Sequence, residues 1–393
     1  MITVDEAHAR LLALVSPLPP VELDLVTAAR HYLHKPLIAD RTQPAADLSA
    51  MDGYAVTGGD FSEPWRVIGQ SAAGHPFSGS LNKGEAVRIF TGAHVPENTH
   101  SILIQEDAVR HGEMLNATLN RVPAAGKHIR RAGGDFKSGD EVLPKGTHLD
   151  AGSIAVAAMA GHGRLVVGRW PRIAIVATGD ELVTAGVPCS PAQIPSSNSP
   201  MLLAMLSDLP CDVFDAGILR DDLTELETVL ATLSEQADII VTTGGASVGD
   251  HDLVQTALLN IGAQMDFWKV AMRPGKPLMA GKVRDAVVLG LPGNPSSAFV
   301  TAFLFLLPLI RYLAGSLTPI PELSEAPTST DLPAGGIRTE YLRAYVQFGG
   351  IMPINGQDSG LTRTLARANA LLVQEAHVLA RPKGTTVQYI RVS

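Results

Sequence analysis

The chain has 393 residues, of which 46% are hydrophobic and 18% are charged, and its formal net charge is −8. A chain of this length is too long for one ordinary core, so we expect about two to four domains. Aromatic residues make up only 5%, and together with the negative charge this argues against a general nucleic-acid binder. Any anionic ligand must therefore be held by a local group of cations.

Nothing in the sequence indicates export or a membrane span. Residues 1–10 lack the basic and apolar regions of a signal peptide. The most apolar run, 298–310, is too short to cross a bilayer and contains Pro308, so we expect a buried helix. Cys189 and Cys211 have no metal-type spacing, which fits free thiols in a reducing compartment. The sequence predicts a cytoplasmic protein without membrane contact.

The first part of the chain changes character twice. Helical spacing of apolar residues predicts helices over 4–15 and 21–33. Residues 45–145 contain short strand-like runs, such as 86–90 and 101–109, separated by Gly and Pro turns, which predict a β-rich module. A further helix, ended by glycine, is predicted over 153–163.

From about residue 168, apolar strands alternate with helices. Strands are predicted over 172–178, 211–219 and 238–243, helices over 221–233 and 253–262, and further strands over 265–272, 278–283 and 286–291. This alternation predicts a mostly parallel, doubly wound sheet, which binds ligands beyond the carboxyl ends of its strands. Five residues follow predicted strands directly and should gather at that edge: Glu181, Asp221, Gly244, Gly245 and Pro292.

The C-terminal part follows a Pro-containing stretch, 316–336, that has the composition of a linker. Strand-like runs over 339–348, 370–374 and 385–392 then predict a small β-barrel or sandwich.

The sequence lacks the motifs of several common enzyme classes. There is no G-x-x-x-x-G-K-[ST] loop and no G-x-G-x-x-G between a strand and a helix, which argues against P-loop NTPases and ordinary nicotinamide enzymes. Neither His-x-x-Glu-His nor paired Cys-x-x-Cys indicates zinc.

The stretch VTTGGASVGDHD, 241–252, passes from a strand into glycines, Ser247 and two acids. Glycines let a ligand approach the backbone closely, and Asp250 and Asp252 could hold a hard cation such as Mg²⁺. A solvated loop with acids near a helix start explains the same residues equally well.

Two further stretches have the chemistry of an anion site. In 268–278, Lys269, Arg273 and Lys276 surround a Pro-Gly turn and can converge on one anion, unless they are merely solvated. In 289–299, the prolines of a Pro-Gly-Asn-Pro turn stiffen the start of a helix, which suits anion binding but also any well-made turn.

The β-rich module carries three polar residues in unusual settings. Asp52 stands between Met51 and Gly53, Thr91 precedes a glycine, and Asp135 follows two glycines. Taken singly, each is more often turn chemistry than a site.

Together these motifs resemble the MoeA family of molybdopterin molybdenumtransferases, which includes the gephyrin E domain. The matching segments follow in the family's order along nearly the whole chain: 49–56, 91–97, 130–140, 178–182, 196–200, 242–252, 267–277 and 291–298.

The resemblance implies an elongated homodimer of four-domain subunits. It implies a helical N-terminal domain (1–44 plus 141–167), an inserted β-rich domain (45–140), a molybdopterin-binding α/β domain (168–316) and a C-terminal β-barrel (317–393). The implied reaction inserts molybdate into adenylylated molybdopterin and releases AMP, with Mg²⁺ as cofactor. Contacts with a molybdopterin adenylyltransferase and with apo-molybdoenzymes are implied as well.

The resemblance also implies the roles of individual residues. Its catalytic residues match Asp52, Thr91, Asp135, Glu181, Asp221 and Asp252, with Asp221 and Asp252 on the metal side. Its substrate- and molybdate-binding residues match Ser247, Lys269, Arg273, Lys276, Pro292, Pro295, Arg343 and Ser359. Asp52, Thr91 and Asp135 are expected to complete the site across the dimer interface. Arg273 stands where many relatives have lysine, which keeps the charge but changes reach and geometry.

Three other functions fit parts of the sequence. A molybdopterin adenylyltransferase uses the same α/β fold, but standalone enzymes of that kind lack the β-rich module and the C-terminal domain. A non-catalytic molybdopterin-binding scaffold and a paralogue without turnover are the remaining alternatives.

Overall fold

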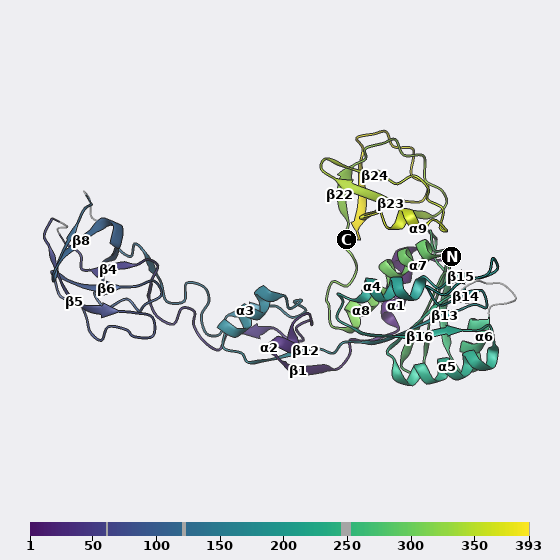
Figure 1. Ribbon diagram of the computed structural model, residues 1–393, viewed down its shortest axis with the longest axis horizontal. Coiled ribbons are helices and arrows are strands. Elements are labelled where there is room, and N and C mark those ends of the chain that lie inside the picture. Colours follow the sequence, from purple (N-terminus) through teal and green to yellow (C-terminus); the bar gives the residue numbers. More distant parts are fainter. Residues whose placement is uncertain (60–61, 120–122, 245–252, 393) are drawn as a thin grey trace.

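The computed structural model describes residues 1–59, 62–119, 123–244 and 253–392. The molecule is elongated: a β-rich domain lies at one end, a narrow middle part follows, and the α/β domain and the C-terminal sheet lie together at the other end (Figure 1).

The α/β domain is built on a six-stranded sheet whose order is β16-β13-β17-β21-β20-β18. Neighbours among the first four strands are parallel, while β20 and β18 are added antiparallel. The strands are β13 (Arg172–Thr178), β16 (Asp212–Leu219), β17 (Ile239–Thr243), β18 (Gln264–Lys269), β20 (Pro277–Val283) and β21 (Ala286–Leu291). The prediction of a mostly parallel sheet is confirmed.

Helices cover both faces of this sheet because its strands are apolar on both sides. Ala174 and Val176 of β13 pack toward α5 (Leu223–Gln236) and α6 (Leu253–Asn260). Ile173 and Ile175 belong to the opposite core, which includes α1 (Val4–Ala13), α4 (Asn198–Leu206), α7 (Pro295–Thr301) and α8 (Leu307–Leu313). Alternation with period two thus distributes each strand between two cores.

The helical stretch Pro295–Leu313 is apolar and long enough to cross a membrane, but 83% of its most apolar window is buried inside the protein. The predicted buried helix is therefore confirmed. It consists of α7, a π-helical segment Ala302–Leu306 and α8. Pro308 has no N–H to donate to the carbonyl of Leu304, and the Nε2 of His8 donates to this oxygen instead, at 2.7 Å.

His8 makes folding sensitive to acid. Burial lowers its pKa from the ordinary 6.5, against the raising effect of the bond to Leu304. The unfolded chain therefore takes up the proton first, so this contribution to stability is present above about pH 6.5 and is lost as the pH falls. We expect His8→Gln, which keeps an N–H donor, to have a melting temperature that falls less steeply between pH 7.5 and 5 than the unmodified protein's. Equal slopes would contradict this role; a residual slope is expected from His31 and His148, whose pKa values burial also lowers.

The N-terminal region is largely β rather than helical, which corrects the predicted helical domain. The predicted helix 21–33 is wrong: residues Pro20–Asp24 form strand β1, and only Leu25–Ala28 form a short helix, α2. β1 pairs antiparallel with β12 (Arg164–Gly168), and partly buried Val21 and Leu23 alternate toward a small core. Asp24 then accepts the N–H groups of Val26 and Thr27, which starts α2.

Two other features complete the middle part. Strand β2 (Leu37–Ile38) pairs with β11 (Glu141–Leu143), and helix α3 (Ala151–Met159) corresponds to the helix predicted over 153–163. A Cβ atom on Gly168 would lie 1.9 Å from the carbonyl oxygen of Ala314, so only glycine allows β12 to pass this close to the α/β domain.

The β-rich domain contains a six-stranded sheet in the order β7-β4-β6-β5-β9-β8. Its strands are β4 (Gly53–Val56), β5 (Trp65–Ser71), β6 (Glu85–Ile89), β7 (Ser101–Ile104), β8 (Ala108–His111) and β9 (Met114–Ala117). Strand β3 (Leu48–Ser49) pairs with β10 (Ile129–Arg130) beside it, and a 3₁₀ helix, Gln105–Asp107, separates β7 from β8.

The C-terminal sheet has the order β19-β23-β25-β26-β22, with β24 paired to β23. The elements are β22 (Ser324–Pro327), β23 (Thr339–Gln347), β24 (Gly350–Pro353), α9 (Thr362–Leu365), β25 (Ala370–Gln374) and β26 (Thr386–Arg391). A bridge between Thr328 and Ile351 links the end of β22 to β24. Part of the stretch with the composition of a linker, 316–336, therefore forms strand β22 of the C-terminal sheet.

Strand β19 (Met272–Arg273) connects the two bodies. It belongs by sequence to the loop between β18 and β20, yet it pairs in parallel with β23 of the C-terminal sheet, Arg273 opposite Glu340. The loop predicted to bind an anion is therefore held by both domains.

Candidate active site

The carboxyl ends of the parallel strands surround a hollow of about 350 Å³, which we call the strand-edge pocket. Glu181 after β13, Gly244 after β17 and Asn294 after β21 line it, as the strand order predicts. Gly244 has φ +92°, and a Cβ there would lie 2.4 Å from the carbonyl oxygen of Thr178, so glycine permits this close approach of two strand ends.

Two buried oxygens in the strand-edge pocket lack partners. Thr178 Oγ1 and Asn198 Oδ1 have no hydrogen bond within the described part of the chain, although Asn198 Nδ2 donates to the carbonyl of Gly293 at 2.8 Å. Buried polar atoms are nearly always paired in native proteins. These oxygens are thus available to a polar ligand.

Acidic groups meet beside this pocket at the ends of β13 and β16. The Oδ1 atom of Asp180 accepts the backbone N–H of Asp221 at 3.2 Å. Asp221 is exposed, as expected for a group that binds a ligand or ion from solvent. No group of three His, Cys, Asp or Glu side chains poised for a metal occurs among the described residues. Ser247, Asp250 and Asp252 lie outside the described residues.

Next to the strand-edge pocket lies a second hollow of about 280 Å³, which we call the anion pocket because its lining includes Arg273, Lys276 and Arg338. Pro292, Asn294 and Ser359 complete its polar and turn elements. Asn294 lines both hollows, and its Nδ2 donates to Ser359 Oγ at 3.2 Å. Pro295 lines the strand-edge pocket instead.

Arg338 is a cation of this pocket that the sequence analysis missed. It follows the two glycines at the end of the supposed linker, where nothing in the local pattern marks it as a site residue. Its guanidinium donates to the carbonyl of Met272 at 3.3 Å, which holds it beside the loop of Arg273.

The three pocket cations differ in how strongly they are neutralised. Arg273 donates to the carboxylate of Glu340 at 3.2 Å, and this carboxylate is largely buried. Lys276 makes no ion pair within residues 1–59, 62–119, 123–244 and 253–392. Arg338 makes no ion pair among the same described residues either, so Lys276 and Arg338 both keep uncompensated charge to offer an anion.

Lys269 does not line the anion pocket, which corrects the expectation that it converges there with Arg273 and Lys276. It opens onto a separate hollow lined by Met1, Ile2 and Arg10, among others. The cause is the N-terminal segment: Ile2 donates to the carbonyl of Lys269 at 3.3 Å, and Ala271 donates to that of Ile2 at 2.8 Å. The backbone at the end of β18 still pairs with Lys276 and Pro277, but the side chain of Lys269 lies beside the N-terminal segment.

Arg343 is placed differently from the expectation that it binds molybdate directly. Its side chain is 1% exposed and its guanidinium donates to five groups: Ser296 Oγ (2.6 Å), Gln357 Oε1 (3.4 Å) and the carbonyls of Asp358 (2.8 Å), Gly356 (3.1 Å) and Leu361 (3.1 Å). All five N–H groups of arginine are thereby used. Arg343 positions the loop that carries Ser359 against the start of α7.

The expected residues of the β-rich domain form a polar pair and one separate acid. Asp52 Oδ1 accepts the backbone N–H of Thr91 at 2.7 Å and its hydroxyl at 2.8 Å, and these two bonds lower the pKa of Asp52 below its usual 3.8. Asp135 is exposed, and its backbone N–H donates to Gln43 at 3.1 Å. Within one chain, the β-rich domain lies at the opposite end from the α/β domain (Figure 1).

The fold and the pockets define a multidomain protein whose α/β sheet presents polar pockets at its carboxyl edge, one of them cationic. Three family models match it: the MoeA N-terminal region (domains I and II) over 2–161, a probable molybdopterin binding domain over 174–312, and the MoeA C-terminal region (domain IV) over 325–392.

Relatives match over most of the chain. A molybdopterin molybdenumtransferase of Haemophilus influenzae is 38% identical over 80% of this chain and 78% of its own, and one of Bacillus subtilis is 31% identical over 100% and 94%. The fold is also that of a molybdopterin biosynthesis moeA protein from Pyrococcus horikoshii, with a TM-score of 0.85, 24% identity and 100% of both chains covered. The chain belongs to the MoeA family of molybdopterin molybdenumtransferases.

Proposed function

We propose that this chain inserts molybdate into adenylylated molybdopterin and releases AMP, in the cytoplasm. Its family membership makes it a transferase that inserts molybdate into molybdopterin. The adenylylated form of the substrate and the release of AMP are our proposal. The observation that carries it is that the two pockets are neighbours: a cationic pocket large enough for molybdate adjoins a hollow flanked by acids.

The two pockets suit different parts of the reaction: the anion pocket suits molybdate, and the strand-edge pocket suits the phosphoanhydride. Molybdate is a dianion. Lys276 offers it an ammonium group, and Arg273 and Arg338 each offer a planar guanidinium that can donate two hydrogen bonds. The phosphoanhydride would lie in the strand-edge pocket, where the hydroxyl of Thr178, unpartnered among the described residues, could donate to a phosphate oxygen. Cleaving that bond spreads negative charge over phosphate oxygens, which protein carboxylates alone would oppose.

Mg²⁺ fits the donors beside the strand-edge pocket. It binds through one or two carboxylates and completes its shell with water and phosphate oxygens, so Asp221, with Asp180 next to it, is chemically sufficient on the protein side. We assign Asp221 as a ligand and Asp252 as a second. When bound, the ion would neutralise charge developing on the phosphate oxygens.

We further propose that two copies form each active site. The hydrogen bonds from Thr91 favour the ionised form of Asp52, so its carboxylate can act as a base or a ligand. The α/β domain of the same chain, however, lies at the opposite end of the molecule (Figure 1). A homodimer of twofold symmetry would bring the β-rich domain of one copy to the pockets of the other. Adenylyltransferase and apo-molybdoenzyme partners are proposed on the family resemblance alone.

The test is AMP release from adenylylated molybdopterin with and without molybdate and Mg²⁺. We expect release to require both, and the product to activate an apo-molybdoenzyme. AMP loading from ATP and molybdopterin, without molybdate-dependent release, would favour an adenylyltransferase. Binding without either reaction would leave a scaffold.

Lys276→Met is expected to raise the molybdate concentration for half-maximal rate by about tenfold or more, because loss of a charge-assisted contact costs roughly 1.5–3 kcal/mol. The same assay run on Lys269→Met should give a smaller rise, since Lys269 lies outside the anion pocket. Lys282→Met, in β20 and outside both pockets, controls for removal of a lysine. An equal or larger effect at Lys269 would contradict the assignment of the pocket.

A further inference from the structure

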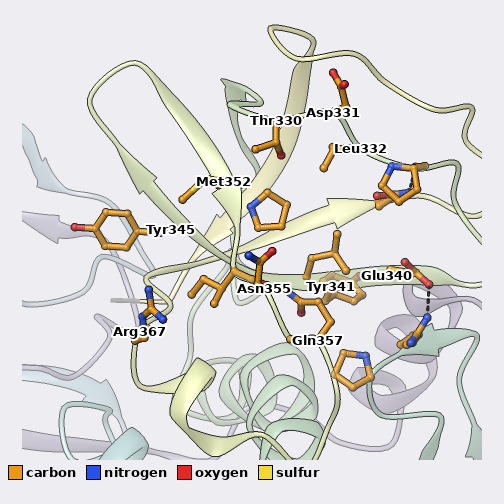
Figure 2. Close-up of a pocket in the computed structure, with 18 residues that line it drawn as sticks. Thr330, Asp331, Leu332, Glu340, Tyr341, Tyr345, Met352, Asn355, Gln357 and Arg367 are labelled. Atoms are coloured by element: carbon orange, nitrogen blue, oxygen red, sulfur yellow. Dashed lines mark hydrogen bonds and ion pairs between the residues drawn. The ribbon is translucent and has the colours of Figure 1, made fainter.

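The C-terminal sheet contains a cavity of about 950 Å³ that none of the functions above uses, and we call it the C-terminal cavity (Figure 2). Tyr345, Met352 and Arg367 lie on one side of it, Glu340 on the other, and Asn355, Gln357 and Tyr341 between them (Figure 2). Its volume is that of a site for a drug-sized molecule.

The lining is suited to a flat, polar heterocycle. Tyr341, Met352 and Ile354 supply aromatic and apolar contact surface, while Asn355 and Gln374 supply amides; the amide of Gln357 is fully bonded to Arg343 and Ile354. Such a combination, mostly apolar with a few polar groups, is typical of small-molecule sites.

Gln374 brings a buried polar side chain to the lining of this cavity. Its side chain is 1% exposed, and its Nε2 donates to the carbonyl of Pro333 at 2.8 Å. Its Oε1, however, has no hydrogen-bond partner within the described part of the chain. A buried acceptor left in this way costs free energy, so a ligand with an N–H donor would gain from meeting it.

The cavity lies next to the anion pocket. Arg273, Pro274 and Gln357 line both, and Asn294 in turn joins the anion pocket to the strand-edge pocket. No residue lines both the C-terminal cavity and the strand-edge pocket. The three hollows therefore follow one another in a row, with the anion pocket in the middle.

We propose that the C-terminal cavity binds the pterin end of the substrate. This rests on the proposed function, in which molybdate occupies the anion pocket and meets the dithiolene there. The dithiolene lies between the pterin rings and the phosphate, so the two ends of the substrate must leave the anion pocket in opposite directions. The phosphate end belongs beside Asp221 and Asp180, which leaves the C-terminal cavity for the pterin, whose amino and ring N–H groups match the free Oε1 of Gln374.

The test is a fluorescence titration of the full-length protein with 6-hydroxymethylpterin, which has neither a phosphate nor a dithiolene. We expect saturable binding that saturating AMP and molybdate do not displace. Gln374→Leu should weaken binding by about tenfold, the effect of one lost hydrogen bond in a buried site. Asn355 lines the cavity at an exposed position, so replacing it should not disturb folding. We expect Asn355→Leu to weaken pterin binding about fivefold or more. Gln388→Leu in β26, the same change outside the cavity, should leave it unchanged.

Two results would overturn the proposal: unchanged pterin affinity in both cavity variants, or competitive displacement of the pterin by AMP. The assay of AMP release separates this from the proposed function. If release persists with an unaltered KM for adenylylated molybdopterin in Asn355→Leu, the cavity assignment fails and the function stands. If release never occurs but pterin binding responds to the variants, the function fails and the cavity assignment stands.

Discussion

Arg343→Met is expected to lower the rate of molybdate insertion by about 100-fold or more and to destabilise the C-terminal sheet. The buried guanidinium satisfies three backbone carbonyls, of Gly356, Asp358 and Leu361, and each loses a donor in the variant. A buried acceptor left unpaired costs about 1–3 kcal/mol. The loop carrying Ser359 would then be held only by the longer bonds of Ser296 to Leu361 and of Asn294 to Ser359, which loosens the wall of the anion pocket.

The position of Arg343 also predicts which kinetic constants change. Because Arg343 acts through the loop, the KM values for molybdate and for adenylylated molybdopterin should both rise. Arg343→Lys should recover little, since an ammonium has three donors where the site uses five. Arg363→Met, at an exposed position on neighbouring α9, is the control. If Arg343→Met raised the molybdate KM alone and left the melting temperature unchanged, direct contact with molybdate would be the better assignment.

Co-expression of Asp52→Asn with Asp221→Asn is expected to restore activity that neither variant has alone. In a mixed dimer one site receives both substitutions and the other receives neither, so the purified mixed dimer should have about half of the normal specific activity. The measurement is AMP release by mixed dimers purified through two different tags. This result requires that the β-rich domain of one copy serves the α/β domain of the other.

A matched pair of variants controls the experiment. Asp52 and Thr91 belong to one hydrogen-bonded pair, so a mixed dimer of Asp52→Asn and Thr91→Ala has one damaged residue in each site. It should have only the mean of the activities that the two variants show when each is measured alone. If mixed dimers of Asp52→Asn and Asp221→Asn stay inactive, both acids serve the active site of their own chain, and the proposal of a shared site is contradicted.

Much of the α/β domain was predictable because local sequence determines it. Runs such as 173–177 are apolar at every position, which marks strands buried on both faces, and the order of the strands brings Glu181 and Gly244 to one edge. The prediction of a helix over 21–33 was wrong because the first residues of this segment pair with β12 as strand β1 (Pro20–Asp24). This pairing outweighed the helical spacing of a few apolar residues.

The parts of the site that escaped prediction depend on contacts between domains. Arg338 lies just before β23, and the pairing of β23 with β19 brings it to the anion pocket. The sequence around Arg338 contains no pattern that predicts this pairing. Lys269 is drawn away by the first residues of the chain. The sequence shows Arg343 only as a cation in a predicted strand. Its burial could not be predicted because it depends on the loop that folds around the guanidinium.

The pairing of Pro20 with Gly168 has a consequence for the history of the molecule. Antiparallel partners have Cα atoms about 5 Å apart, a gap that a tight turn can close. The chain therefore leaves the α/β domain and rejoins it at almost the same point. An ancestor with a simple hairpin here would have had an uninterrupted catalytic body. The whole β-rich arm, with Asp52 and Thr91 on it, could then have been acquired by a single insertion that disturbed no strand of the main sheet.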